Sequence, residues 1–176
     1  MTKQNKKGFT IIEVVLVLAI GGLIFLMVFI ALPALQRSQR NTQREDDLAR
    51  LLTAVNDYQT NNSGKTPFEN NDVNNNFLKR YVDEETEYDA NKPITVCGDQ
   101  FKDPDGECYQ IKWKGSGAKG DKGKATGLTD FDHTFYVYTN AGCGDLEGTY
   151  DVGTGKRQVA IFFVEEGGAI ACNDNH

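Results

Sequence analysis

The sequence has few of the residues on which enzyme active sites depend. It contains two histidines and only three serines, Ser38, Ser63 and Ser116. The G-x-S-x-G nucleophile motif is absent, and His133 lies in the stretch FDHTFYVY, where a histidine on the surface of a sheet is the ordinary explanation. The sequence therefore argues against a membrane-anchored enzyme. It predicts no catalytic residue and no cofactor.

Cysteine is also scarce, and all four cysteines lie in the second half of the chain, at Cys97, Cys108, Cys143 and Cys172. No C-x-x-C spacing occurs, which argues against a zinc site. An even number of cysteines in an exported domain is typical of disulfides, and four cysteines allow three pairings. We favour Cys97–Cys108 with Cys143–Cys172, because each pair joins elements that are neighbours in the sequence.

Charge is missing from one long stretch, the 22 residues from Val14 to Leu35. As a helix this stretch is about 33 Å long, enough to cross a hydrocarbon core of ~30 Å. A secretory signal peptide fits poorly, because the run is too long and no small-residue cleavage site follows it. A plain membrane anchor leaves Glu13 unexplained, since a charge held in the bilayer costs about 2.5–3.5 kcal/mol on translocon scales.

The segment KKGFTIIEVVLVLAIGG resembles the N-terminus of a type IV prepilin. The residues that carry the resemblance are Lys6, Lys7, Gly8, Phe9, Thr10 and Glu13, with Gly21 and Gly22 in the middle of the apolar run and Pro33 near its end. Pro33 lies a few residues later than in many members of the family. The resemblance covers about 35 residues of the 176 in the chain.

This resemblance implies a set of roles for the N-terminal residues. A membrane peptidase would cut between Gly8 and Phe9, and the new amine of Phe9 would be methylated. Glu13 would be an assembly residue, whose carboxylate neutralises the Phe9 amine of a neighbouring subunit and so sets the register of the filament. The resemblance also implies a helix-melting segment, carried by Gly21, Gly22 and Pro33.

We expect three regions and an α+β fold. Residues 1–8 are the cleaved leader, and residues 9–62 form one long helix, transmembrane or filament core over 9–35 and amphipathic over 36–62. An apolar stripe with helical spacing marks the amphipathic part, at Leu48, Leu51, Leu52, Val55 and Tyr58. Residues 63–176 are a disulfide-bonded, β-rich head whose antiparallel sheet covers the helix, as in type IV pilins.

Within the head we predict a short helix near Phe77–Val82, with Asp72 as its N-cap. We predict strands at 94–97, 108–113, 134–140, 158–165 and 169–172, the last two joined as a hairpin through Glu166, Gly167 and Gly168.

Three weaker signals remain open. Asp103, Asp105 and Glu107 alternate around a glycine and form a weak calcium candidate, for which a plain turn is the alternative. The segment KGSGAKGDKGKATG predicts a basic loop that either contacts DNA or another anionic surface or is simply solvated. The arginines that follow the apolar run either pair with acidic patches on neighbouring subunits or form a solvated face: Arg37, Arg40, Arg44 and Arg50.

Together these features predict the main structural subunit, or major pilin, of a type IV pilus, a surface filament that serves motility, adhesion or DNA uptake. The alternatives are a pseudopilin of a secretion system and a minor pilin. The family resemblance implies four partners: other copies of the chain, a prepilin peptidase, an assembly ATPase and a membrane platform protein. The expected path runs from a single-pass membrane protein to an extracellular filament. The net charge of −6 argues against general nucleic-acid binding.

Overall fold

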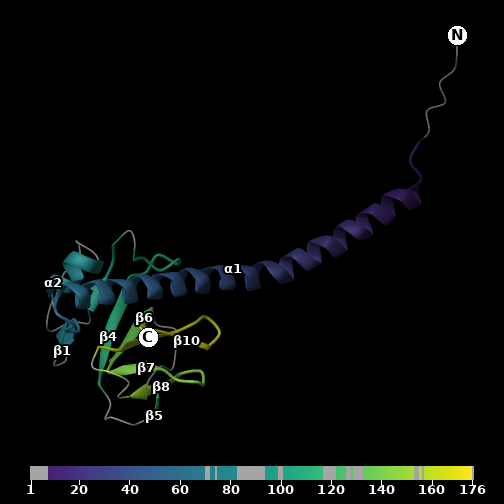
Figure 1. Ribbon diagram of the computed structural model, residues 1–176. Helices are drawn as coiled ribbons and strands as arrows, with labels where there is room; N and C mark the ends of the chain where they lie inside the picture. Colours follow the sequence, from purple (N-terminus) through teal and green to yellow (C-terminus); the bar gives the residue numbers. More distant parts are fainter. Residues whose placement is uncertain are drawn as a thin grey trace. The chain divides into compact units, whose positions relative to one another are not determined.

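The structure is a computed structural model. It describes residues 8–69, 72–73, 75–82, 94–98, 101–116, 122–125, 128, 133–152, 155 and 157–175. These residues fall into two compact units, residues 1–39 and residues 40–176, and each is described by itself below. The second unit contains the outer half of the long helix together with all of the strands, as Figure 1 shows.

The first element is the helix α1, Ile11–Asn61, with Pro33 inside it. The helix ends where the backbone of Ser63 and Gly64 turns to positive φ, at 58° and 79°. The N–H of Gly64 then donates to the carbonyl of Gln59 at 2.7 Å, which satisfies one of the last carbonyls of the helix. The prediction of a long helix ending near residue 62 agrees with these bounds.

A five-stranded sheet has the strand order β10-β9-β6-β4-β3. Its strands are β3 (Ile94–Val96), β4 (Tyr109–Ser116), β6 (Thr134–Thr139), β9 (Val159–Val164) and β10 (Ile170–Asp174). All five were predicted from the sequence, and β9 and β10 form the expected antiparallel hairpin. The α+β architecture, a long N-terminal helix followed by an antiparallel-dominated sheet, is confirmed.

One pair of strands departs from the antiparallel expectation, because β4 and β6 run parallel. Parallel neighbours need a crossover of a dozen or more residues, whereas antiparallel neighbours can be joined by a tight turn. The long connection between Ser116 and Thr134 serves this purpose, and it includes a strand of another sheet, β5 (Lys122–Lys124). The sequence analysis did not anticipate this crossover.

Two smaller sheets were not predicted. One has the order β5-β8-β7 and contains β7 (Ala141–Cys143) and β8 (Thr149–Val152), and the other pairs β1 (Phe68–Glu69) with β2 (Asp72–Val73). Their strands are two to four residues long. Such strands are too short for an alternating pattern to be distinguished from a loop.

The predicted short helix is present as two consecutive turns, α2 (Asn75–Phe77) and the π-helical η1 (Leu78–Val82). The assignment of Asp72 as its N-cap was wrong, because Asp72 lies in strand β2 and pairs with Glu69. The sequence pattern therefore predicted the position of the helical turns but not the residue at which they begin. The ends of helices are generally defined less sharply than their middles.

Strands β6 and β9 are buried on both faces of the five-stranded sheet, and this explains their nearly continuous apolar sequences. Along β9, Val159, Ile161 and Phe163 join a core that contains the α1 stripe, while the alternate residues Ala160, Phe162 and Val164 join a second cluster. The side chains of strand β6 alternate between the same two clusters. Because successive side chains point to opposite faces, a strand covered on both sides has no polar positions to alternate with.

The α1 stripe supplies one wall of the first core. Leu51 and Val55 have no exposed surface, and Leu48 is 2% exposed. Fully burying one such side chain is worth about 1.5–3 kcal/mol, so the stripe ties residues 48–58 of the helix to the sheet. The apolar stripe predicted from the helical spacing is therefore buried in the core of the head.

Candidate functional site

The bond predicted to be cleaved, between Gly8 and Phe9, lies before the start of α1, and the residues on both sides of it are exposed. Gly8, Phe9 and Thr10 precede the first helical residue, and Phe9 is 90% exposed. A peptide bond in this position is open to a peptidase without unwinding the helix. The residues before Gly8 lie outside the described part of the chain.

Thr10 and Glu13 form a reciprocal cap at the start of α1. The carboxylate of Glu13 accepts hydrogen bonds from the backbone N–H and the hydroxyl of Thr10, both at 2.8 Å. The hydroxyl of Thr10 in turn accepts from the backbone N–H of Glu13 at 3.4 Å. This arrangement is the capping box, which satisfies donors that the first turn of a helix leaves unpaired. The sequence signature T-x-x-E was present, but the sequence analysis did not use it.

The inner half of α1 presents an apolar surface on all sides. Its large apolar side chains between Phe9 and Leu35 are 44% to 90% exposed. Among the described residues, α1 is the one helix long and apolar enough to cross a membrane by length and composition. A helix that is apolar all round is buried in a membrane or in an assembly, so this surface is suited to lipid or to other helices.

Gly21, Gly22 and Pro33 all lie within the helix. A methyl group added at Gly21 or at Gly22 would meet no atom within 4 Å, so packing inside the chain does not require either glycine. Glycine lowers helix stability by ~1 kcal/mol relative to alanine, and proline removes a helical hydrogen bond. Melting of this segment stays a prediction.

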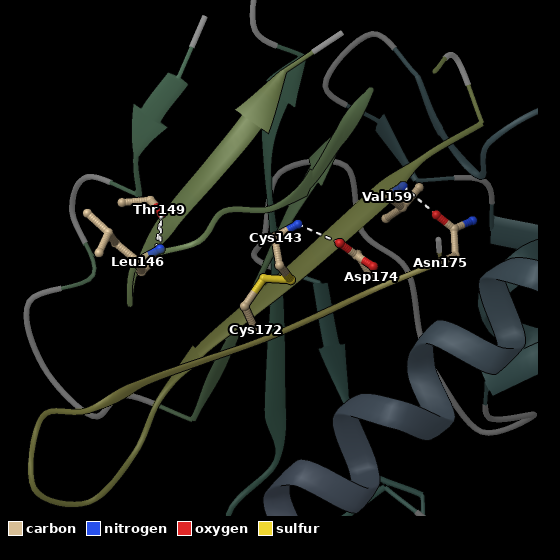
Figure 2. Close-up of a disulfide and its surroundings, with 7 residues drawn as sticks. All are labelled: Cys143, Leu146, Thr149, Val159, Cys172, Asp174 and Asn175. Atoms are coloured by element: carbon tan, nitrogen blue, oxygen red, sulfur yellow. Dashed lines mark hydrogen bonds between the residues drawn. A yellow bond between two sulfur atoms is a disulfide. The ribbon is translucent and has the colours of Figure 1, made fainter. Parts of the chain in front are cut away.

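Both predicted disulfides are present in the head. Cys97 is bonded to Cys108, and Cys143 is bonded to Cys172. Figure 2 shows that the second bond joins β7 to β10, and that the backbone N–H of Cys143 also donates to the carboxylate of Asp174, at 2.5 Å. The small sheet is therefore fastened to the edge of the large one at two adjacent points.

A side chain next to this disulfide was missed by the sequence analysis. The Oδ1 atom of Asn175 accepts from the backbone N–H of Val159 at 2.8 Å (Figure 2), and its amide nitrogen donates to Asn56 on α1 at 2.9 Å. It also donates to the side chain of Gln59 and to the carbonyl of Arg157. One amide thus joins the segment after β10 to β9 and to the helix, and no local sequence pattern marks it.

Removing the bond between Cys143 and Cys172 should lower the stability of the head by about 3–4 kcal/mol on the chain-entropy model. The cysteines of this pair are 29 positions apart in the sequence, whereas Cys97 and Cys108 are 11 apart, so the double serine variant of the shorter loop should lose less stability. Denaturant midpoints of both variants check this order. Non-reducing peptide mapping of the exported protein checks the pairing, and free thiols there would contradict it.

Two of the arginines after the apolar run pair within their own head. Arg44 has no exposed surface, and its guanidinium binds both carboxylate oxygens of Asp103, at 2.6 and 2.7 Å. It also donates to Glu166 at 2.7 Å, and Arg40 binds Glu166 at 2.7 and 2.5 Å. The expectation of pairing with neighbouring subunits is therefore wrong for Arg40 and Arg44. These bonds tie α1 to the loop after β3 and to the β9–β10 turn.

Asp103 and Asp105, two residues of the weak calcium candidate, are partners in this ion-pair network, and their contacts differ from those of a calcium loop. The carboxylates of Asp103 and Asp105 and the ring of His133 lie within 4.8 Å of one another, a grouping that could hold a metal ion. However, the guanidinium of Arg44 already neutralises Asp103, and His133 bonds Asp105 at 2.7 Å. The side chain of Glu107 is exposed and is not part of the group.

The carboxylate of Glu166 contributes a pH-dependent part of the stability of the head. Hydrogen bonds from Arg40, and then from Arg44, lower the pKa of Glu166 from 4.5 to about 2. A carboxylate with a lowered folded-state pKa contributes stability in full above about pH 4.5 and loses it as the pH falls toward 2. We expect the stability difference between wild type and Glu166→Gln to shrink over that window. Urea midpoints at several pH values measure it, with the exposed Glu107→Gln as control, and a constant difference would contradict the assignment.

The basic segment is only partly described. Lys122–Lys124 form strand β5, and residues 117–121 and 126–127 lie outside the described residues. On strand β4, in the five-stranded sheet, the amines of Lys112 and Lys114 lie 5.6 and 5.2 Å from the centre of the Tyr136 ring. Contact of this segment with an anionic surface stays a prediction.

Comparison with known proteins adds one finding to this geometry. The prokaryotic N-terminal methylation motif matches residues 3–29, a range that contains Gly8, Phe9 and Glu13. No curated protein and no solved structure matches the chain. The motif supports a type IV pilin-like prepilin or a pseudopilin. The methylation motif and the long apolar N-terminal helix, followed by an antiparallel-dominated sheet, together fit a type IV pilin.

Proposed function

We propose that this chain is the structural subunit of a type IV pilus. It is inserted into the membrane as a prepilin, cut after Gly8, methylated on Phe9 and polymerised through the inner half of α1. The observation that carries the proposal is the methylation motif at residues 3–29, which ends within the exposed apolar part of α1. In this role the protein is not an enzyme. The work of assembly is done by a prepilin peptidase, an assembly ATPase and a membrane platform protein.

Glu13 has two successive partners in this proposal. In the single chain its carboxylate is held by Thr10, which lowers the cost of keeping a charge near lipid. In the filament the same carboxylate pairs with the Phe9 amine of a neighbour, because each charge in an apolar core is costly alone and tolerable when paired. The pairing fixes register more than it adds strength.

A pseudopilin is the second candidate, because the same motif occurs at the start of such proteins. Two disulfides in the head favour the pilus, because pseudopilins often lack a disulfide-rich head. A label specific to this subunit, imaged on intact cells, separates the two. Long labelled surface filaments support the pilus, and label confined to the envelope supports the pseudopilin.

Processing provides the direct test of the proposal. The mature protein should begin at Phe9 and carry a methyl group on its amine, which mass spectrometry of sheared filaments or of the membrane fraction detects. Gly8→Val should block the cut and leave full-length prepilin in the membrane, because the peptidase must accommodate a residue without a bulky side chain at this position. An intact leader in the wild type, or a cut after the apolar run, would contradict the pilin assignment.

A further inference from the structure

A polar groove of about 870 Å³ lies where the last turn of α1 meets α2 and η1. Its volume is within the range of ~300–1,000 Å³ typical of small-molecule sites. The groove is separate from the Arg44 network and from both disulfides, since it shares no residue with them. Its lining combines amides, cations and aromatic rings, and these three kinds of group point to one class of ligand.

The amides come from the end of α1. Asn61 and Asn62 donate their side-chain N–H groups to the carbonyls of Asp57 and Tyr58, at 2.9 and 2.8 Å. These bonds cap the helix and fix the direction of both amides. In the described part of the chain no donor reaches either Oδ1 atom, so two oriented acceptors are available in the groove. Their natural partners are hydroxyl donors.

The cations come from η1. Lys79 and Arg80 are adjacent and exposed, and neither has an ion-pair partner among the residues that the structure describes. An ammonium and a guanidinium that line the same groove are suited to a carboxylate or a sulfate, and the planar guanidinium can bind two of its oxygens at once.

Aromatic rings also line the groove. Tyr81 is half-buried and packs edge-on to Tyr58, with ring centres 5.6 Å apart, while Phe77 stacks on it at 6.1 Å. These contacts hold the Tyr81 ring in place and leave part of it at the surface. A rigid ring of this kind provides apolar contact area at low entropic cost.

We propose that this groove binds an acidic sugar, an oligosaccharide whose rings carry carboxylate or sulfate groups. Hydroxyls of the sugar would donate to Asn61 and Asn62, its anionic group would lie between Lys79 and Arg80, and a ring face would pack on Tyr81. The phosphodiester backbone of a nucleic acid has few hydroxyl donors for the amides, so the sugar satisfies the groove better. Binding by a single chain does not depend on assembly. A filament would repeat the site and raise its avidity without any new contact.

The test uses the full chain in detergent micelles, with tetragalacturonate as the probe and maltotetraose as its neutral counterpart. Titration followed by ligand-observed NMR should show binding of tetragalacturonate. The double variant Lys79→Gln/Arg80→Gln should weaken it by about tenfold or more, which corresponds to ~1.4 kcal/mol. The matched variant Arg37→Gln/Lys102→Gln removes the same charge from exposed positions outside the groove, and it should change binding less than about twofold.

Three results would overturn the proposal. The first is no binding of tetragalacturonate by the wild type. The second is any sign of nonspecific charge attraction. Such a sign would be an equal loss of affinity in both double variants, or inorganic sulfate that displaces tetragalacturonate as effectively as unlabelled saccharide does. The third is a fall of more than about 5 °C in the melting temperature of Lys79→Gln/Arg80→Gln, which would show that these cations hold the head together instead of binding a ligand.

Discussion

Glu13→Gln is expected to reduce filament yield to a small fraction of wild type while processed monomer accumulates in the membrane. The substitution removes the negative charge, so the Phe9 amine of each incoming subunit would enter the filament core unpaired. Breaking one partner of a buried ion pair costs about 3–5 kcal/mol. The penalty recurs at every subunit, and filament growth therefore fails even though insertion and cleavage proceed.

The structure sharpens this test, because glutamine can take the place of glutamate in a capping box. Glu13→Gln therefore keeps the hydrogen bonds with Thr10 that start the helix, and it removes only the charge. Glu13→Ala removes both and serves as the comparison. Equal loss of filaments in the two variants assigns the defect to the charge, whereas a defect in the alanine variant alone assigns it to helix capping.

The measurement is the yield of sheared filaments set against the monomer in the membrane fraction. Co-expression of Glu13→Gln with wild type should give partial poisoning, because a mutant subunit fails only with the neighbour that it should have paired. If Glu13→Gln assembles at the wild-type yield, the carboxylate has no intersubunit partner. Its role would then be confined to the contact with Thr10 or to recognition by the peptidase.

Arg44→Met should produce the largest loss of stability of any single substitution considered for the head. It leaves the carboxylate of Asp103, which has no exposed side-chain surface, without its guanidinium. We expect the free energy of unfolding to fall by about 3–5 kcal/mol. For a domain of this size the melting temperature should then fall by roughly 10–20 °C.

Two further variants test whether Arg44→Met destabilises the head by leaving a buried charge unpaired or only by removing contacts of the arginine side chain. Arg50→Met is the matched control on the same helix, since the side chain of Arg50 is 60% exposed and its bond to Asp47 is long, at 3.4 Å. Asp47 is itself buried, but without Arg50 it keeps the hydrogen bond from the Tyr109 hydroxyl at 3.0 Å, and water screens the exposed Arg50 end of the pair. The loss should therefore be clearly smaller than for Arg44→Met. The double variant Arg44→Met/Asp103→Leu should recover much of the loss, because it removes the unpaired charge as well. Thermal unfolding in detergent measures all three, and an Arg44→Met variant no weaker than Arg50→Met would contradict the assignment.

The sequence carried enough information for the parts of this protein that depend on local pattern. The apolar run, the helical stripe from Leu48 to Tyr58 and the five longer strands all have periodicities or lengths that a single sequence displays. The disulfide pairing could also be proposed, because Cys97 and Cys108 flank one turn, while Cys143 and Cys172 each lie close to an expected strand.

The ion-pair network could not be predicted in the same way. Arg44 and Asp103 are 59 positions apart, and Arg44 and Glu166 are 122 apart, so nothing in the local sequence distinguishes a buried arginine from the exposed Arg50. The parallel pairing of β4 and β6 is hidden for a similar reason, because it depends on where a long connection leads. The capping box is different, because its T-x-x-E spacing is visible in the sequence. Glu13 was interpreted from the family resemblance as an assembly residue, and its local role in the helix cap was not considered.

The place of the α1 stripe in the core has a consequence for the order in which the head can fold. Leu51 and Val55 are made early, yet Ile161 and Phe163, which share their core, follow roughly a hundred residues later. Until β9 exists, the apolar side of this helix has no sheet to cover it. Contacts of such long range form slowly, and exposed apolar surface favours aggregation in the meantime. Helper proteins that bind apolar segments would be most valuable to this chain between the synthesis of its helix and the synthesis of its ninth strand.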